Sequence, residues 1–132
     1  MIGIVIVSHS IKIAAGVCDL ARQMAAPELA LIAAGGMADG AIGTDAIKIQ
    51  TAIEAADSGD GVVILVDLGS AVLSTDLAMD LLAPELRQRV ILADAPLVEG
   101  AILAAIEASN ADSTLQKVVS TATGARNLQK IL

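Results

Sequence analysis

The chain opens with Ile2-Gly3-Ile4-Val5-Ile6-Val7-Ser8-His9-Ser10, an apolar run that breaks into three polar residues. A short, near-continuous apolar run is typical of a parallel strand that is covered on both faces. The polar residues stand where such a strand would end, and helical periodicity follows them. The stretch therefore predicts a buried strand that leads through a short turn into a helix.

Three further apolar runs alternate with longer segments of helical period. The expected strands are Ile2–Val7, Leu29–Ala34, Val62–Val66 and Val90–Ala93. This alternation is the pattern of a parallel sheet with crossover helices. We therefore expect an α/β fold with three layers (α/β/α), a central, mainly parallel four-stranded sheet and a single domain over residues 1–132.

The helices are bounded by capping residues and prolines. They are expected at Ile11–Ala25, Thr44–Asp57, Ser70–Leu82 and Glu99–Ala108, with a last helix opened by Ser113. Thr44 is expected as an N-cap, and Gln116 stands three residues after Ser113, which is capping-box spacing. The third helix is expected to stop ahead of Pro84.

Large apolar residues at spacings of three and four are expected to face the sheet. They are Ile13, Val17, Leu20 and Met24 in the first helix and Leu73, Leu77 and Leu81 in the third. Lys48 is expected on the exposed side of the second helix. Cys18 falls on the apolar side of the first helix and is expected to be buried and inert.

Composition excludes several classes of protein. The hydrophobic share of 55% argues against disorder, and the net charge of −7 with no aromatic residue argues against a nucleic-acid partner. The single cysteine favours a reducing, cytoplasmic setting, and one histidine with one cysteine offers no structural zinc site. The apolar runs are too short for a signal peptide or a bilayer span, so no membrane partner is expected.

His9, the only histidine, is the leading candidate for chemistry. It follows the first strand, and Asp67 follows the third, so right-handed crossovers would bring both to the carboxyl edge of the sheet. Asp67 would accept from one imidazole nitrogen and leave the other free as a nucleophile for phosphorus. The backbone at Ser10 and at Gly69-Ser70-Ala71 would bind the phosphoryl oxygens, with no metal required.

Each feature also has a structural interpretation. A lone histidine after a strand is often incidental, and Asp67 before Gly69-Ser70 is typical of a helix cap. Ser70 and Thr44 are themselves more typical of N-caps than of catalysts. The glycine-rich stretch 35–43 matches no phosphate-binding motif and favours a flexible connection.

Five segments together resemble the mannose-type enzyme IIA family. They are Val5–Ser10, Ala33–Gly36, Ile42–Asp45, Val66–Ala71 and Ala95–Ala101. Within that family, the whole chain is similar to the phosphotransferase subunits of phosphoenolpyruvate-dependent dihydroxyacetone kinases. The resemblance implies an enzyme IIA-like fold, usually homodimeric, in which the carrier protein HPr phosphorylates His9.

The resemblance further implies that His9 passes the phosphoryl group to ADP, which stays on a partner subunit as ADP/ATP, so that this chain binds no cofactor. Asp67 matches the residue that orients the histidine, and Gly69-Ser70 the phosphate-contacting turn.

Three alternatives remain. A sugar-specific mannose-class enzyme IIA tends to have a Gly-Gly-Ser-Pro turn and a glycine after the histidine, whereas this chain has Leu68-Gly69-Ser70-Ala71 and Ser10. The second alternative is a non-catalytic phosphorylation sensor. The third makes Asp67 the phosphoacceptor, as in receiver domains, but the first strand lacks the acidic residues that a metal would need there.

Overall fold

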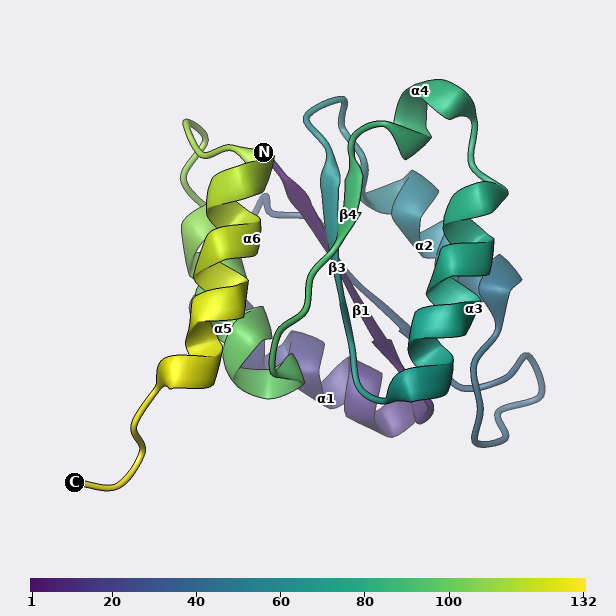
Figure 1. Cartoon of the computed structure of the whole chain (residues 1–132), viewed down its shortest axis with the longest axis horizontal. Coiled ribbons are helices and arrows are strands. Elements are labelled where there is room, and N and C mark those ends of the chain that lie inside the picture. Colours follow the sequence, from purple (N-terminus) through teal and green to yellow (C-terminus); the bar gives the residue numbers. More distant parts are fainter.

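Four parallel strands form the centre of the molecule, and the computed structural model describes all residues from 1 to 132 around them (Figure 1). The strands are β1 (Gly3–Ser8), β2 (Leu31–Gly35), β3 (Val62–Val66) and β4 (Val90–Leu92). Their order is β2-β1-β3-β4, and every neighbouring pair is parallel. The predicted strands are confirmed: the bounds of β3 are as predicted, and the ends of the others differ by at most two residues.

Helices cover both faces of this sheet, as Figure 1 shows. One layer contains α1 (Ile11–Arg22), α5 (Leu97–Ala108) and α6 (Leu115–Gly124), followed by the short η1 (Ala125–Asn127). The other contains α2 (Ala46–Ala56), α3 (Gly69–Asp80) and the short α4 (Pro84–Arg87). The three-layer α/β/α architecture is therefore confirmed.

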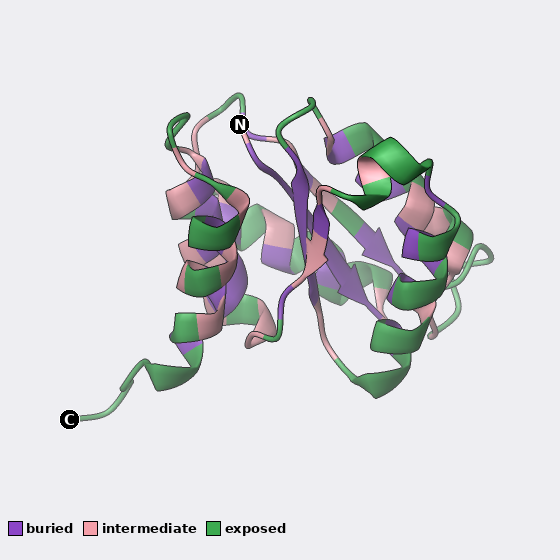
Figure 2. Ribbon diagram, turned by 45° about the horizontal axis from the view of Figure 1, so that its top comes forward, coloured by how far each residue is buried: buried purple, intermediate pink, exposed green.

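Alternate residues of the buried strands serve the two cores. In β1, Ile4 and Ile6 pack toward α1 and α5, whereas Val5 and Val7 pack toward α2 and α3. Successive side chains of a strand point to opposite faces, so a strand buried on both sides must be apolar throughout. Figure 2 shows the resulting buried centre of the sheet.

The buried faces of α1 and α3 differ from the prediction. In α1 the sheet-facing residues are Ala14, Val17 and Ala21, and of the four predicted residues only Val17 is buried. The side chains of Ile13, Leu20 and Met24 are 50%, 49% and 58% exposed, respectively. Small alanines let the helix backbone approach the sheet closely, and the larger residues then point outward.

The same reversal occurs in α3, where Ala71, Thr75, Ala78 and Met79 are buried. The predicted core residues Leu73, Leu77 and Leu81 are 71%, 54% and 46% exposed. Apolar residues lie on both sides of this helix, so their spacing alone could not select the inner side.

Two helix starts lie one residue after the predicted caps. Asp45, rather than Thr44, caps α2 and accepts from the amide of Ile47 at 2.9 Å. Thr114, rather than Ser113, caps α6 and accepts from the amide of Lys117 at 3.2 Å. In both cases two neighbouring residues have side chains that can cap a helix, and the second of the two is the N-cap in the structure.

Two further bounds differ at prolines. Pro84 begins α4 instead of only ending the helix before it, because proline has no N–H and suits the first helical turn. Pro96 is likewise the N-cap of α5, which starts at Leu97 rather than at Glu99.

Cys18 lies half-buried on α1 and packs against the core beneath this helix. Burial raises the pKa of its thiol to about 11, so the thiol stays protonated at neutral pH. No helix combines the length and the apolar character needed to cross a bilayer.

The strand order reverses between β1 and β3. The chain moves outward from β1 to β2 and then returns to the other side of β1 for β3. Crevices at such reversals, outside the carboxyl ends of the strands, are where open α/β sheets bind their ligands. The residues that follow β1 and β3 therefore occupy the place where a site is expected.

Candidate active site

His9 and Asp67 meet beyond the carboxyl ends of β1 and β3. The Nδ1 atom of His9 lies 2.9 Å from Oδ1 of Asp67. The backbone N–H of His9 also donates to Oδ2 of the same carboxylate at 3.0 Å. The two side chains are 22% and 14% exposed, so the pair is near the surface and still reachable.

Ser8, the last residue of β1, supports this pair from below and is fully buried. Its hydroxyl donates to Oδ2 of Asp67 at 2.7 Å and accepts the backbone N–H of Ser10 at 3.1 Å. Ser8 was not among the functional residues expected from the sequence. A signal was present, because a polar residue at the end of a fully buried strand needs internal hydrogen-bond partners.

Asp67 is held in its ionised form. Its partial burial favours the neutral acid, but hydrogen bonds from Ser8, from the backbone and ring of His9 and from the backbone of Leu68 outweigh burial. The pKa of Asp67 therefore lies below its usual value. A carboxylate at this position accepts the proton of His9 Nδ1, which leaves the lone pair on Nε2.

The Nε2 atom of His9 faces the hydroxyl of Ser70 in the first turn of α3, and the two atoms are in hydrogen-bond contact. With the proton on Nδ1, the Ser70 hydroxyl donates and Nε2 accepts. Ser70 is not the N-cap that its position suggested, because Leu68 occupies the N-cap and offers no side-chain acceptor. Asp67 does not cap α3 either, since its Oδ1 accepts from Leu68, before the helix begins.

The first amides of α3 are free to bind an anion. The backbone N–H groups of Gly69 and Ser70 form no hydrogen bond within the protein. The N–H of Ala71 donates to the carbonyl of Leu68 at 2.9 Å, and that of Ser10 is used by Ser8. Of the four predicted phosphate-binding residues, Gly69 and Ser70 thus offer unused amides, whereas Ser10 and Ala71 do not.

The glycine-rich loop after β2 packs against the backbone of His9. The N–H of Gly43 donates to the carbonyl of His9 at 2.8 Å, and Gly43 has a φ of 145°. A side chain at Gly43 would start 2.8 Å from the sulfur of Met37. Hydrogen bonds and close packing thus join this loop to the backbone of His9.

Lys48 helps to hold the start of this loop. Its Nζ donates to the carbonyl of Gly35 at 2.8 Å, and the side chain is half-buried rather than on the exposed side of α2 as predicted. Asp94 follows β4, the outer strand that β3 separates from β1. Its carboxylate pairs with Arg126 at 3.1 Å. The structure does not bring Asp94 to His9.

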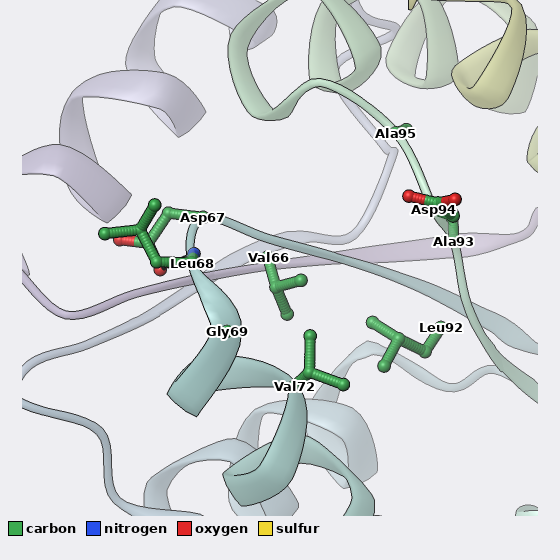
Figure 3. A pocket seen from close by; sticks show the side chains of 9 residues that line it. All are labelled: Val66, Asp67, Leu68, Gly69, Val72, Leu92, Ala93, Asp94 and Ala95. Atoms are coloured by element: carbon green, nitrogen blue, oxygen red, sulfur yellow. Dashed lines mark hydrogen bonds between the residues drawn. The ribbon is translucent and has the colours of Figure 1, made fainter.

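A shallow hollow of about 360 Å³ adjoins Asp67 on the side of β4. Figure 3 shows Val66, Val72 and Leu92 around it, with Asp94 at its border. His9 does not line this hollow. No group of three or more His, Cys, Asp or Glu side chains gathers to hold a metal ion.

This arrangement suits phosphoryl transfer. One nitrogen of His9 is held by a carboxylate, and the other lies beside a hydroxyl and the unused amides at the start of a helix. Those amides can stabilise the negative oxygens of a phosphoryl group.

Comparisons with known proteins point to the same family. Residues 3–119 match the EIIA-man family model, which describes the PTS system fructose IIA component. A protein of Escherichia coli (strain K12) is 44% identical over 122 residues, which are 90% of this chain and 26% of that protein. It is named PEP-dependent dihydroxyacetone kinase, phosphoryl donor subunit DhaM.

A shorter relative comes from Listeria innocua and is named PEP-dependent dihydroxyacetone kinase 2, phosphoryl donor subunit DhaM. It is 41% identical over 107 residues, which are 81% of this chain and 86% of that protein. A crystal structure of the unknown-function protein EF1359 has a TM-score of 0.83 and 39% identity, and it covers 94% of this chain and 95% of that chain.

The chain spans 26% of the length of the Escherichia coli relative but most of the Listeria innocua one. The matched segment includes the whole sheet and both residues of the His9–Asp67 pair. The chain thus belongs to the EIIA-man family of PTS system IIA components.

Proposed function

We propose that this chain is the phosphoryl-transfer unit of a DhaM-type subunit of a PEP-dependent dihydroxyacetone kinase. In this role His9 accepts a phosphoryl group from HPr and then passes it to ADP, which is bound on a partner subunit. The observation that carries the proposal is the orientation of His9, because Asp67 holds Nδ1 and Nε2 faces the start of α3. The names of the relatives supply the substrate class.

In the first step, the lone pair of His9 Nε2 attacks phosphorus on the phosphohistidine of HPr. The bond between phosphorus and the donor nitrogen breaks, and its electron pair returns to the imidazole of HPr. The ring of His9 becomes positively charged when Nε2 is phosphorylated, and the ionised Asp67 beside Nδ1 balances that charge.

In the second step, an oxygen of the terminal phosphate of ADP attacks the phosphorus on His9. The bond from phosphorus to Nε2 breaks, Nε2 regains its lone pair, and ATP forms on the partner subunit. Both steps need the entering and leaving atoms in line, so the site must be open to two different proteins. The partial exposure of His9 suits this requirement.

Ser70 has to move its hydroxyl during the cycle. In the resting protein this hydroxyl occupies the lone pair of Nε2. A rotation of the Ser70 side chain frees Nε2 for attack and lets the hydroxyl donate to a phosphoryl oxygen. The N–H groups of Gly69 and Ser70 would bind the other oxygens.

The same proposal includes a cytoplasmic location, a homodimer and no cofactor bound by this chain, with ADP/ATP kept on the partner subunit. Exposed apolar side chains on α1 and α3 offer surface for contacts between proteins, including a second copy. The Leu68-Gly69-Ser70-Ala71 turn favours the dihydroxyacetone kinase over a sugar-specific enzyme IIA.

The test is the intact mass of wild type and His9→Ala after incubation with phosphoenolpyruvate, enzyme I and HPr. A chase with the ADP-loaded partner subunit follows. We expect one phosphoryl group on the wild type, none on His9→Ala, and loss of that group in the chase as ATP appears.

Two results would contradict the proposal. A phosphoryl group that is gained and never lost to ADP would indicate a sugar-specific enzyme IIA or a sensor. Full phosphorylation of His9→Ala would exclude His9 as the acceptor.

A further inference from the structure

Lys48 is a cation in the first turn of α2 that has no acidic partner. It takes part in none of the ion pairs of the protein, and its Nζ donates to two backbone carbonyls instead. The start of a helix is an unfavourable place for a positive charge, because the helix dipole is positive at that end. The two carbonyl oxygens are therefore the contacts that stabilise this half-buried ammonium group.

The shorter of these contacts is made with the peptide group that joins Gly35 to Gly36. Nζ of Lys48 donates to the carbonyl of Gly35 at 2.8 Å. The N–H of the same peptide group belongs to Gly36 and donates to the carbonyl of Ser8 at 3.1 Å. This peptide group thus binds a cation at its oxygen and directs its N–H to the end of β1.

A second peptide group leads from there to the candidate active site. The carbonyl of Ser8 and the N–H of His9 belong to one peptide group, and that N–H donates to Oδ2 of Asp67 at 3.0 Å. Three hydrogen bonds therefore run in one direction from the ammonium group of Lys48 to the carboxylate of Asp67. We call them the Lys48–Asp67 series.

Hydrogen bonds arranged in this way strengthen one another. A donor that binds the oxygen of a peptide group polarises that group, and its N–H then becomes a better donor to the next acceptor. The Lys48–Asp67 series has a cation at its donor end and an anion at its acceptor end. Both charges polarise the two peptide groups in the same sense, so removal of the cation weakens every bond of the series.

The acceptor end of the series is the carboxylate that holds His9. Oδ2 of Asp67 accepts the last bond of the series, while Oδ1 lies 2.9 Å from Nδ1 of His9. Partial burial raises the pKa of Asp67, but hydrogen bonds, including the one from the His9 backbone, bring it below its usual value. The series thus favours the ionised carboxylate, which keeps the proton of His9 on Nδ1.

A different role for Lys48 would be to close the loop after β2. Its second acceptor is the carbonyl of Met37 at 3.4 Å, but that carbonyl also accepts the N–H of Gly40 at 3.0 Å. The N–H of Met37 donates to the carbonyl of Ala41 at 2.9 Å, and the N–H of Ala41 donates to the side chain of Asp39 at 3.0 Å. The turn of the loop is therefore closed by its own hydrogen bonds, and the contact with Gly35 is the one that leads to the site.

We propose that Lys48 is a positioning residue for His9, which acts on the carboxylate of Asp67 through the two peptide groups of the Lys48–Asp67 series. With the cation in place, the carboxylate holds Nδ1 of His9 and the lone pair stays on Nε2. The inference rests on the proposed function in one respect, namely that His9 accepts the phosphoryl group.

The test is a double-mutant cycle of Lys48→Met and Asp67→Ala. The rate of His9 phosphorylation is measured for wild type, both single variants and the double variant with phosphoramidate, a small donor that needs no protein contact, and separately with phosphorylated HPr. Lys12→Met is the matched control, because Lys12 is an exposed cation in the first turn of α1. The amide proton resonances of Gly36 and His9 are recorded by NMR for each folded variant.

We expect Lys48→Met to slow phosphorylation about three- to tenfold when Asp67 is present and to leave the rate of Asp67→Ala unchanged. Lys12→Met reacts as wild type. The amide protons of Gly36 and His9 move upfield in Lys48→Met, because weaker hydrogen bonds deshield them less, and they stay in place in Lys12→Met.

An unchanged rate of folded Lys48→Met would overturn the proposal, and so would amide resonances that do not move. If Lys48→Met slows wild type and Asp67→Ala by the same factor, Lys48 acts by a route that does not include Asp67, and the proposal is wrong. If Lys48→Met does not fold, Lys48→Gln, which keeps a donor but no charge, decides by the same criteria.

The failure of the proposed function would look different. Wild type would then accept a phosphoryl group from neither phosphoramidate nor phosphorylated HPr. The amide resonances of Gly36 and His9 report on the Lys48–Asp67 series without any phosphoryl transfer, so they would decide the inference on their own.

Discussion

The carboxylate of Asp67 holds both the ring and the backbone of His9. Its Oδ1 lies 2.9 Å from Nδ1, and its Oδ2 accepts the His9 amide at 3.0 Å. One side chain at the end of β3 therefore sets both the position and the tautomer of the residue that follows β1. This relation predicts that Asp67 orients His9 and does not take part in bond making.

Replacement of Asp67 by alanine is expected to slow phosphorylation of His9 by about 100-fold without abolishing it, because the nucleophile remains but its orientation is lost. The measurement is the single-turnover rate with phosphorylated HPr. Asp112→Ala is the control, since this exposed carboxylate follows α5, away from His9, and forms no ion pair. Complete loss of transfer in a folded Asp67→Ala protein would contradict a role limited to orienting His9 and balancing the charge of its ring.

Ser8→Ala is expected to destabilise the fold by about 1–3 kcal/mol. The change removes the acceptor of the Ser10 amide and the hydroxyl that donates to Oδ2 of Asp67. The pKa of Asp67 is expected to rise in this variant, since its hydrogen bond from Ser8 is lost. Urea unfolding measures the stability, and Ser58→Ala, whose hydroxyl contacts Met1 at the surface, is the control. Equal stabilities of the two variants would exclude the supporting role of Ser8.

Stability should fall in acid through Asp67. Its pKa is lowered in the folded protein from an ordinary value of 3.8, so its contribution is complete above about that pH and is lost as pH falls through the folded pKa. Unfolding free energies of wild type and Asp67→Asn between neutral pH and pH ~2.5 test this. We expect their difference to shrink below the ordinary pKa, and a constant difference would contradict the linkage.

The ion pair of Asp57 and Arg89 joins the end of α2 to the start of β4, with contacts of 2.6 and 3.0 Å. Asp57→Ala is expected to cost about 2 kcal/mol of stability, because the carboxylate also accepts the amides of Gly59 and Gly61. Phosphorylation of His9 should be unchanged, because the pair lies at the opposite edge of the sheet. A stability equal to that of wild type would contradict this prediction.

Gly35 permits the close approach of β2 to the start of α1. A Cβ atom there would lie 2.5 Å from the carbonyl oxygen of Ser10, so Gly35→Ala is expected to displace the turn that carries His9. We expect lower stability and slower phosphorylation. Gly16→Ala is the matched control, since nothing lies within 4 Å of its Cβ position and alanine favours the helix by about 1 kcal/mol. A Gly35→Ala protein as active as wild type would exclude this close-contact role.

The strands and the His9–Asp67 pair could be predicted because both follow from short-range pattern and connectivity. A strand buried on both faces must be apolar throughout, and parallel strands bring their carboxyl ends to one edge. His9 and Asp67 were expected at the same edge of the sheet, and the strand order β2-β1-β3-β4 makes them neighbours. The role of Ser8 was missed because the sequence shows that a serine at the end of a buried strand needs internal hydrogen-bond partners, but not which groups supply them.

The helix faces could not be predicted in the same way. In α3, Leu73 and Leu77 are four residues apart and the buried Ala71 and Ala78 are seven apart; both spacings fit one side of a helix, so local periodicity cannot rank them. The contact distance between helix and sheet decides, since alanines permit a close approach and leucines do not.

The sequence by itself determined a parallel α/β sheet and the place of His9 and Asp67 at its carboxyl edge, because both depend on which residues follow a strand. Only the tertiary structure decided which helix surfaces are buried, which amides of α3 remain free and which hydroxyl faces Nε2. Those features depend on packing between elements far apart in the chain, and packing is set by the summed volume of side chains from both partners.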